Sequence, residues 1–160
     1  MKKTELTINI TSYNLNELAD EDRQLVEMAK QATDNAYAPY SGFKVGTCGR
    51  RIDGSTFIGT NQENAAYPSG LCAERTALFG AMAQDPEHAI TTLAIAARNG
   101  EGSFTKTPIV PCGACRQVML EVEARYHQPM RILLYGTDGI IAIDSAKDLM
   151  PLSFSADSMR

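Results

Sequence analysis

Three of the four cysteines stand in two short clusters, and their spacing limits what this chain can build more than any other feature. The clusters are Cys72-Ala73-Glu74 and Pro111-Cys112-Gly113-Ala114-Cys115, and each opens a helical pattern. Side chains in the first turn of a helix lean toward its N-terminus, so Cys112 and Cys115 can point at one spot beyond the helix end. The partial positive charge there lowers the pKa of a thiol and favours metal binding. With Cys72 as a third ligand, the pattern predicts a three-cysteine metal site.

A zinc ion on three protein ligands keeps a fourth position for water, which separates a catalytic site from a closed structural one. Zinc with three thiolates has a net charge of about −1 and is a weaker Lewis acid than zinc on neutral imidazoles. Two helix N-termini together offset roughly one unit of negative charge, and hydrogen bonds from Arg75 and Arg116 to sulfur could offset more. Glu74 can then carry a proton from water to a substrate, a role that contributes about 10²–10⁴-fold in rate.

The composition narrows the class of partner. The 160 residues are 44% hydrophobic and 21% charged, which suits one domain spanning residues 1–160. The net charge of -4 argues against nucleic-acid binding, which needs clustered Lys and Arg, and a small-molecule ligand fits better. Residues 4–11 alternate polar and apolar side chains without a run of signal-peptide or membrane length. We therefore expect a cytoplasmic location, no membrane association and reduced cysteines.

Apolar spacing and turn residues indicate alternating helices and strands. The expected helices cover residues 18–36, 72–84 and 111–126, and the expected strands cover residues 43–48, 55–60, 93–97, 132–135 and 140–143. Asp53-Gly54 and Asp138-Gly139 supply the turns of two hairpins. This order predicts an α/β fold, a three-layer α/β/α sandwich with a mixed five-stranded sheet. Residues 1–16 are expected to form an extra N-terminal arm, in which residues 6–10 could make an additional edge strand.

Beyond the cysteine clusters, five segments together carry a specific pattern. They are Ala38–Gly46, Asn61–Pro68, Cys72–Ala77, Pro111–Gln117 and Leu149–Phe154. In this order they closely resemble the small, homotetrameric, zinc-dependent cytidine deaminases of the cytidine/deoxycytidylate deaminase superfamily, over about residues 20–155. The resemblance implies hydrolysis of cytidine and 2′-deoxycytidine to uridine and 2′-deoxyuridine with release of ammonia, a step of pyrimidine salvage.

The resemblance also implies a role for each candidate site residue. Cys72, Cys112 and Cys115 would bind one Zn²⁺ per subunit, and Glu74 would be the catalytic proton shuttle. The residues expected at the substrate are Asn61 and Glu63 at the 3′-hydroxyl of the sugar, Phe43 and the Ala73 backbone at the pyrimidine, and Tyr67 and Phe154 at the boundaries between subunits. Tyr40 resembles a further boundary residue. These roles imply a homotetramer with active sites shared between subunits, a nucleoside substrate and no nucleic-acid partner.

Three stretches depart from the pattern of the family. Gly46–Arg51 is more polar and richer in glycine than the apolar strand expected there, and Lys106–Val110 lacks the expected acidic residue. The first 16 residues are an extension without a counterpart. None of these stretches includes a cysteine of the two clusters.

The same residues have other interpretations. Cys48 could be a fourth ligand, which would close the metal site and make the chain a non-catalytic zinc-binding module. Asn61 and Glu63 could be turn residues, the aromatic residues could belong to the core, and the two arginines could be solvated. A deaminase of another cytosine-bearing nucleoside is a further alternative. A nucleotide deaminase is disfavoured, because that family typically has His where this chain has Cys72.

Overall fold

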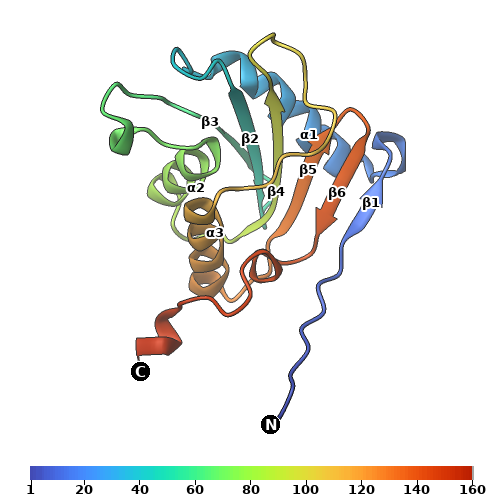
Figure 1. The fold of residues 1–160 in the computed structure, drawn as a ribbon, viewed down its shortest axis with the longest axis vertical. Coiled ribbons are helices and arrows are strands. Elements are labelled where there is room, and N and C mark those ends of the chain that lie inside the picture. The colour runs from blue at the N-terminus through green and yellow to red at the C-terminus, as the bar shows by residue number, and fades with distance from the viewer. Residues whose placement is uncertain (160) are drawn as a thin grey trace.

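The computed structural model describes residues 1–159 and contains one mixed sheet between two helical layers (Figure 1). The strands are β1 (Thr11–Tyr13), β2 (Lys44–Arg51), β3 (Thr56–Thr60), β4 (Ile90–Arg98), β5 (Arg131–Gly136) and β6 (Gly139–Ile143). The main helices are α1 (Asp20–Ala32), α2 (Ala73–Gln84) and α3 (Gly113–Tyr126). Short 3₁₀ turns cover Leu15–Glu17, Thr33–Asn35, Tyr67–Ser69, Ala146–Leu149 and Ala156–Met159. Within the described residues, none of the helices has the length and apolar character needed to span a membrane.

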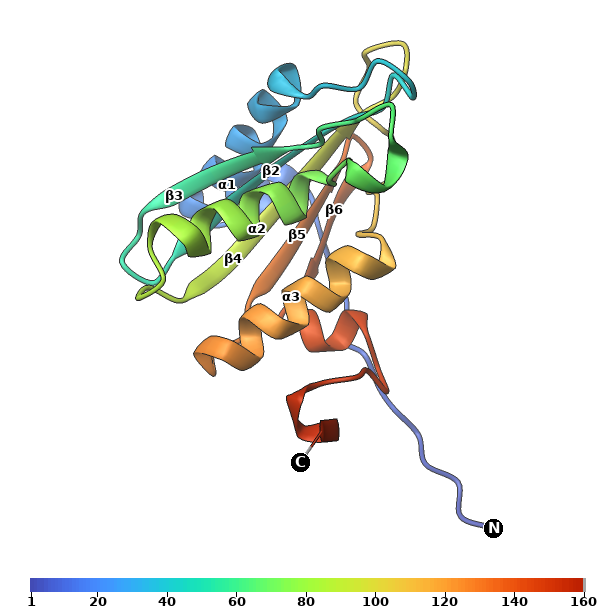
Figure 2. The same ribbon diagram turned by 90° about the vertical axis from the view of Figure 1, so that its left-hand side faces the viewer.

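The sheet has the strand order β1-β6-β5-β4-β2-β3, with α1 on one face and α2 and α3 on the other (Figure 2). Strands β4 and β5 are parallel, and the other neighbouring pairs are antiparallel. A parallel pair needs a crossover connection, and α3 supplies it between β4 and β5. The predicted α/β/α sandwich with a mixed sheet is confirmed. The predicted number of five strands is wrong, because β1 adds a sixth strand beside β6.

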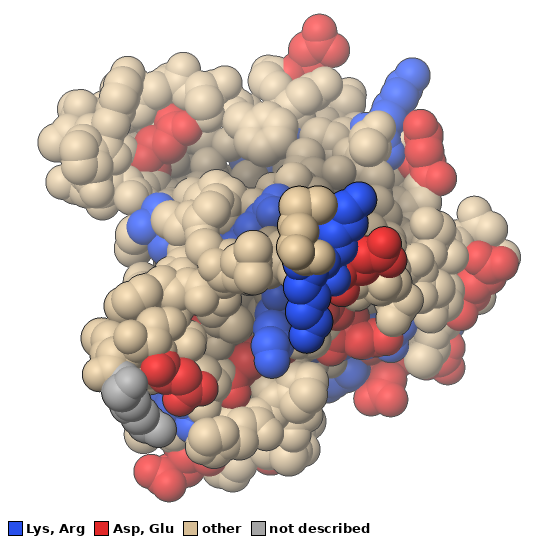
Figure 3. Space-filling model, turned by 60° about the horizontal axis from the view of Figure 1, so that its bottom comes forward, with Lys and Arg blue, Asp and Glu red and all other residues tan. Residues whose placement is uncertain are grey.

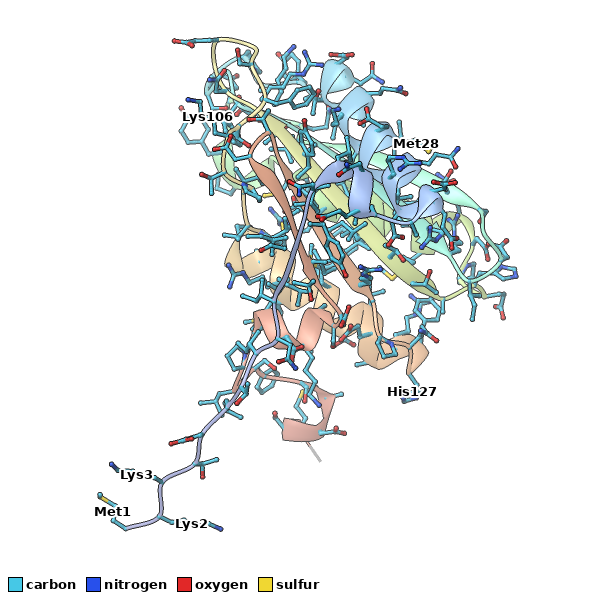
Figure 4. The ribbon with its side chains drawn as sticks, turned by 90° about the vertical axis from the view of Figure 1, so that its right-hand side faces the viewer. Met1, Lys2, Lys3, Met28, Lys106 and His127 are labelled. Atoms are coloured by element: carbon cyan, nitrogen blue, oxygen red, sulfur yellow. The ribbon has the colours of Figure 1, made fainter. Side chains whose placement is uncertain are left out.

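This sixth strand lies later in the N-terminal arm than the sequence predicted. Strand pairing begins at Thr11, whereas residues 6–10 have no regular structure and their apolar side chains are 42–63% exposed. Tyr13 packs against the core under α1, but the residues of the arm before Thr11 have no second layer to cover them. Figure 4 shows the arm, with its first three residues labelled, extending away from the sheet. The expected edge strand at residues 6–10 is therefore wrong in position.

Two glycines let helices lie directly on the sheet. A Cβ atom at Gly46 of β2 would come within 2.2 Å of the Ala29 carbonyl oxygen in α1. A Cβ atom at Gly59 of β3 would come within 2.4 Å of the Ala77 nitrogen in α2. Neither position has room for a side chain, so the glycine at the start of the unusual Gly46–Arg51 stretch serves the approach of α1 to β2.

Each face of the sheet has its own hydrophobic core. The core under α2 and α3 contains large side chains, among them Leu93 and Ile95 of β4. To the core under α1 the same strand contributes the small residues Ala94 and Ala96, which pack with larger ones such as Leu25 and Leu133. Successive side chains of a strand point to opposite faces, so the alternation along β4 divides the two cores.

A buried carboxylate fastens α1 to the sheet. Asp22 is 3% exposed and accepts hydrogen bonds from Arg50 Nη2 at 2.9 Å and from Arg131 Nη1 at 2.7 Å. Arg50 Nη2 also donates to the Thr92 hydroxyl at 3.0 Å. Since Arg50 lies in β2, Thr92 in β4 and Arg131 in β5, the polar part of the Gly46–Arg51 stretch connects the helix to three strands.

Candidate active site

The starts of α2 and α3 bring three cysteine side chains together. Cys72 is the N-cap residue of α2, Cys112 is the N-cap residue of α3, and Cys115 lies in the first turn of α3. Cys112 Sγ lies 3.7 Å from Cys72 Sγ and 3.3 Å from Cys115 Sγ. All three sulfur atoms lie within 4.8 Å of one another. The two cysteine clusters of the sequence therefore meet in space.

The arrangement of the sulfur atoms fits a zinc ion. Zn–S bonds of about 2.3 Å in a tetrahedron put two sulfur atoms about 3.8 Å apart. The separations of 3.7 Å and 3.3 Å are close to this value, and thiolates are ligands that zinc prefers. Cys115 is buried, Cys72 is half-buried and Cys112 is exposed, so the protein does not enclose the cluster on all sides.

Cys48 is not a fourth ligand. It lies on the α1 face of the sheet, where it is fully buried and its Sγ is 4.0 Å from Met28 Sδ. Burial raises the pKa of the Cys48 thiol to about 12. The cysteine therefore behaves as a small core residue, and the alternative of a metal site closed by Cys48 is wrong.

The surroundings of Cys72 stabilise its thiolate. A hydrogen bond from Cys115, one from the Arg75 guanidinium and one from Cys112 lower the pKa of Cys72 to about 5. Arg75 Nη2 is 3.6 Å from Cys72 Sγ. The contact with Cys72, together with burial, raises the pKa of Cys115. The cluster thus holds a thiolate at neutral pH, which favours binding of a cation.

Glu74 lies two residues after Cys72 and is nearly inaccessible to solvent. It is the second residue of α2 and is 4% exposed. Burial raises the pKa of Glu74, and the negative charge of Cys72 raises it further. A raised pKa makes the carboxyl group more ready to take up a proton, which is the property that general acid and base catalysis uses.

The two arginines beside the cysteines have different partners. Arg75 donates to Cys72 Sγ, as the sequence predicted. Arg116 donates instead to two backbone carbonyl oxygens, from Nε to Pro111 at 2.8 Å and from Nη1 to Leu149 at 3.0 Å. The predicted hydrogen bond from Arg116 to sulfur is therefore wrong, because carbonyl oxygens on either side of its guanidinium take these donors.

A cavity of about 530 Å³ opens beside the cysteine cluster. Its walls include Asn61, Glu63, Tyr67, Cys72 and Arg75. Small-molecule sites have volumes of about 300–1,000 Å³, so this cavity is large enough for such a ligand. The fold thus brings the two predicted sugar-binding residues and two predicted boundary residues, Tyr40 and Tyr67, to the side of the metal cluster.

Comparison with known sequences identifies the family that carries this site. Residues 19–127 match the sequence model of the cytidine and deoxycytidylate deaminase zinc-binding region. The chain belongs to this deaminase family. The zinc cofactor expected from the cysteine pattern is thereby confirmed for the chain.

The relatives of this deaminase match it over most of their length. A cytidine deaminase of Halalkalibacterium halodurans is 40% identical over 139 residues, which cover 86% of this chain and 98% of that protein. A cytidine deaminase of Sporosarcina psychrophila is 37% identical over 85% of this chain and 93% of that protein. The crystal structure of cytidine deaminase from Burkholderia pseudomallei superposes with a TM-score of 0.69 and 43% identity, over 82% of this chain and 97% of that one.

In this deaminase, Asn61 also holds the start of β2. Its side-chain Nδ2 donates to the Phe43 carbonyl oxygen at 2.8 Å, and its Oδ1 accepts from the Val45 backbone N–H at 2.8 Å. These two bonds fix the backbone on both sides of residue 44. An amide group has two N–H donors and two lone pairs, so Asn61 keeps one of each for a ligand.

Glu63 likewise holds a loop segment and keeps the capacity to accept a hydrogen bond from a ligand. Its carboxylate accepts from the Tyr40 backbone N–H at 2.9 Å, from the Ser41 backbone N–H at 3.2 Å and from the Ser41 hydroxyl at 2.5 Å. The Ser41 hydroxyl and the Tyr40 N–H lower the pKa of Glu63, so the group is a carboxylate at neutral pH and accepts hydrogen bonds only. Sequence reasoning did not single out Ser41, because nothing in a serine next to a glycine indicates a distant carboxylate partner.

The predicted aromatic site residues of this deaminase differ in solvent exposure. The rings of Tyr40 and Tyr67 pack edge to face with centroids 5.8 Å apart, and both are more than half exposed. Phe154 is 61% exposed, and Phe43 is half-buried before β2. The alternative that these residues belong to the core is therefore wrong for Tyr67 and Phe154. The Ala73 backbone lies at the start of α2, where the residue is fully buried.

Proposed function

We propose that this protein is a zinc-dependent cytidine deaminase, which hydrolyses cytidine and 2′-deoxycytidine to uridine and 2′-deoxyuridine and releases ammonia. The observation that carries the proposal is the three-sulfur cluster with buried Glu74 two residues from Cys72 and a ligand-sized cavity beside it. Relatives named cytidine deaminase that match the chain over most of its length support the same reaction.

The proposed mechanism needs proton transfer at one buried carboxyl group. Cys72, Cys112 and Cys115 would hold the zinc ion, which when bound supplies a Lewis acid that makes water nucleophilic near neutral pH. Glu74 would accept a proton from the attacking water as the water oxygen adds to carbon 4 of the pyrimidine, and would deliver that proton to ring nitrogen 3. The same carboxyl group would then pass the second proton of the water to the exocyclic amine, which leaves as ammonia. The pKa of Glu74, raised by burial, suits both directions of transfer.

Positive charge near the sulfurs would limit the excess negative charge of the site. Three thiolates exceed the charge of Zn²⁺ by one unit. The N-termini of α2 and α3 and the Arg75 guanidinium, 3.6 Å from Cys72 Sγ, oppose this excess. Arg75 would therefore help the site to keep its Lewis acidity.

Asn61 and Glu63 would bind the 3′-hydroxyl of the sugar with the donor and acceptor capacity that their loop contacts leave free. Sites that hydrogen-bond a hydroxyl group discriminate strongly against ligands that lack it. Phe43 would pack against the pyrimidine, and the Ala73 backbone at the buried start of α2 would help to orient the ring. The pocket would then recognise both ends of a nucleoside.

Exposed apolar side chains support a homotetramer with shared active sites. Tyr67 is 74% exposed, Phe154 61% and Leu152 95%. Exposed apolar groups of this size favour burial against further copies of the chain. In the assembly that we propose, Tyr67 and Phe154 complete the site of a neighbouring subunit and Tyr40 lies at the boundary.

Charge and chain organisation complete the proposal. On the face shown in Figure 3, basic side chains gather near the middle with acidic side chains beside them, and most of the remaining surface is uncharged. This pattern and the net charge of -4 fit a nucleoside substrate better than a polynucleotide. We further propose that residues 1–160 form one domain and that the enzyme acts in the cytoplasm in pyrimidine salvage.

The test is the substitution Glu74→Gln, which keeps the size of the side chain and removes the exchangeable proton. We expect the variant to retain zinc and fold and to release ammonia from cytidine about 10²–10⁴-fold more slowly. Glu121→Gln is the matched control, because Glu121 is an exposed glutamate on α3, and this variant should keep the full rate. An unchanged rate in Glu74→Gln would contradict the mechanism.

A panel of cytosine compounds tests the substrate. Loss of the cytosine ultraviolet band is followed for cytidine, 2′-deoxycytidine, 3′-deoxycytidine and free cytosine. The proposal predicts turnover of the first two and much slower turnover of the compounds without a 3′-hydroxyl. Faster turnover of another cytosine nucleoside would show that the proposed substrate is wrong. Absence of turnover by the zinc-loaded protein would indicate a non-catalytic zinc-binding module.

A further inference from the structure

Arg116 links the start of α3 to the C-terminal segment, defined as residues 145–154. Its Nε donates to the Pro111 carbonyl oxygen at 2.8 Å, and its Nη1 donates to the Leu149 carbonyl oxygen at 3.0 Å. A guanidinium is planar and holds its N–H groups at fixed angles to one another. One side chain therefore sets the position of two carbonyl groups that lie far apart in the sequence.

The first of these carbonyl groups determines how the chain enters Cys112. The Pro111 carbonyl belongs to the same planar peptide unit as the backbone nitrogen of Cys112. Pro111 is buried, and its ring restricts its own φ angle. Cys112 is exposed, and its side chain makes no capping hydrogen bond to α3. The bond from Arg116 thus fixes the peptide plane from which the Cys112 side chain starts, in addition to the contacts of the Cys112 sulfur with Cys72 and Cys115.

The second carbonyl group belongs to a segment that α3 holds at further points. Glu123 accepts from the backbone N–H groups of Ala146 at 2.8 Å and Lys147 at 3.1 Å. Gln117 Nε2 donates to the Phe154 carbonyl oxygen at 2.9 Å. The Ser145 hydroxyl also donates to Glu123 at 3.0 Å. Side chains of α3 therefore hold the C-terminal segment at several points, mostly through its backbone atoms.

We propose that Arg116 is a positioning residue that fixes the Cys112 sulfur for zinc and, through the same guanidinium, anchors the C-terminal segment. The inference deepens the proposed function and rests on it for the use of the metal site. Zinc affinity and order of the C-terminal segment are coupled, because both depend on one side chain. If Arg116 had a purely structural role, its substitution would lower the unfolding temperature of the protein without changing how tightly the folded protein holds zinc.

Three variants separate these roles. Arg116→Met removes both donors and keeps much of the length of the side chain. Arg116→Lys keeps the charge but loses the fixed pair of donors. Arg125→Met is the matched control, since Arg125 lies in the last turn of α3 and its guanidinium contacts Met82 and the Tyr126 ring.

Zinc affinity is measured by competition with a chromophoric chelator, and order of the C-terminal segment by amide hydrogen exchange. We expect Arg116→Met to hold zinc about 10–100-fold less tightly, the usual loss when a group that orients a metal ligand is removed. Its Met150 amide, which donates to the Lys147 carbonyl oxygen, should exchange faster. Arg116→Lys should fall between this variant and the unchanged protein, and Arg125→Met should match the unchanged protein in both measurements.

Unchanged zinc affinity in Arg116→Met overturns the proposal, and so does weaker zinc binding with unchanged exchange in the C-terminal segment. Should Arg116→Met fail to fold, Arg116→Lys decides by the same two measurements. Gln117→Leu adds a check, because it frees only the Phe154 carbonyl and should leave both zinc affinity and exchange of the Met150 amide unchanged. Neither measurement needs turnover, so failure here is distinct from failure of the deaminase proposal, which Glu74→Gln tests.

Discussion

The two faces of the central sheet carry cysteines of opposite character. On the α1 face, Cys48 is fully buried in an apolar core, and burial raises its pKa to about 12. On the face of α2 and α3, Cys72 stands at a helix start, and its hydrogen bonds with Cys115 and Arg75 lower its pKa to about 5. The difference teaches that helix ends and neighbouring charges, and not the residue type, decide which cysteine can bind metal.

The buried carboxyl groups of the two faces also differ, because only one of them has cationic partners. Asp22, a residue of α1, forms ion pairs with Arg50 and Arg131, and these fasten the helix to the sheet. Glu74 in α2 forms no ion pair within 4.0 Å among residues 1–159, and burial raises its pKa. A carboxylate with two cationic partners stabilises the fold, whereas a carboxyl group without them is available for proton transfer.

The largest effect should come from replacing Cys112 by alanine, and the same replacement of Cys48 on the other face is the comparison. Cys112→Ala should abolish zinc binding and reduce deamination to background, because two sulfur ligands remain. Cys48→Ala should keep full zinc content and activity and lower the free energy of unfolding by about 1 kcal/mol. Zinc content by atomic absorption, with denaturant unfolding, checks both. Loss of zinc in Cys48→Ala would break the division between the faces.

A second test removes the buried charge of the α1 face. Asp22→Asn removes the buried anionic partner that Arg50 and Arg131 share and leaves them only their exposed partners, Glu21 and Asp144. The variant should lower the free energy of unfolding by about 3 kcal/mol, while zinc content stays the same. Asp20→Asn is the control, since that side chain is 94% exposed and its pair with Arg23 contributes little. Denaturant unfolding of both variants measures the difference. Equal stability of the two variants would show that the buried network is not what holds α1.

The smallest effect should come from the glycines that face each helix. Gly46→Ala and Gly59→Ala should each cost about 1–3 kcal/mol in the free energy of unfolding through overpacking. Only Gly59→Ala should also weaken zinc binding, because its Cβ would lie 2.6 Å from the Ala73 carbonyl oxygen, next to Cys72. Chelator competition measures this second effect. Equal zinc affinity in both variants would mean that a shift of α2 does not reach the metal cluster.

The sequence predicted the metal site well because local geometry determines most of it. A cysteine at a helix start points beyond that start whatever the rest of the fold does, so Cys72, Cys112 and Cys115 could be grouped from spacing. Apolar spacing and turn residues likewise located the three helices and five of the six strands. The position of β1 was predicted wrongly because polar and apolar side chains alternate at residues 6–10, although these residues lie before the part of the arm that packs on the sheet.

Contacts between distant side chains and backbone atoms could not be predicted. Arg116 follows Cys115 in the sequence, but its partners are carbonyl groups of Pro111 and Leu149, which only the folded C-terminal segment brings near. The bonds from Ser41 to Glu63 likewise join segments whose approach no periodicity encodes. Neither spacing nor residue type carries this information, because backbone acceptors exist at every position.

Zinc K-edge X-ray absorption on the purified protein tests the central claim most directly. The account predicts three sulfur neighbours at about 2.3 Å and one oxygen or nitrogen neighbour at about 2.0 Å. This first shell should persist in Cys48→Ala and in Glu74→Gln. A shell of four sulfur atoms, or of fewer than three, would contradict a site built from Cys72, Cys112 and Cys115 with one position left for water.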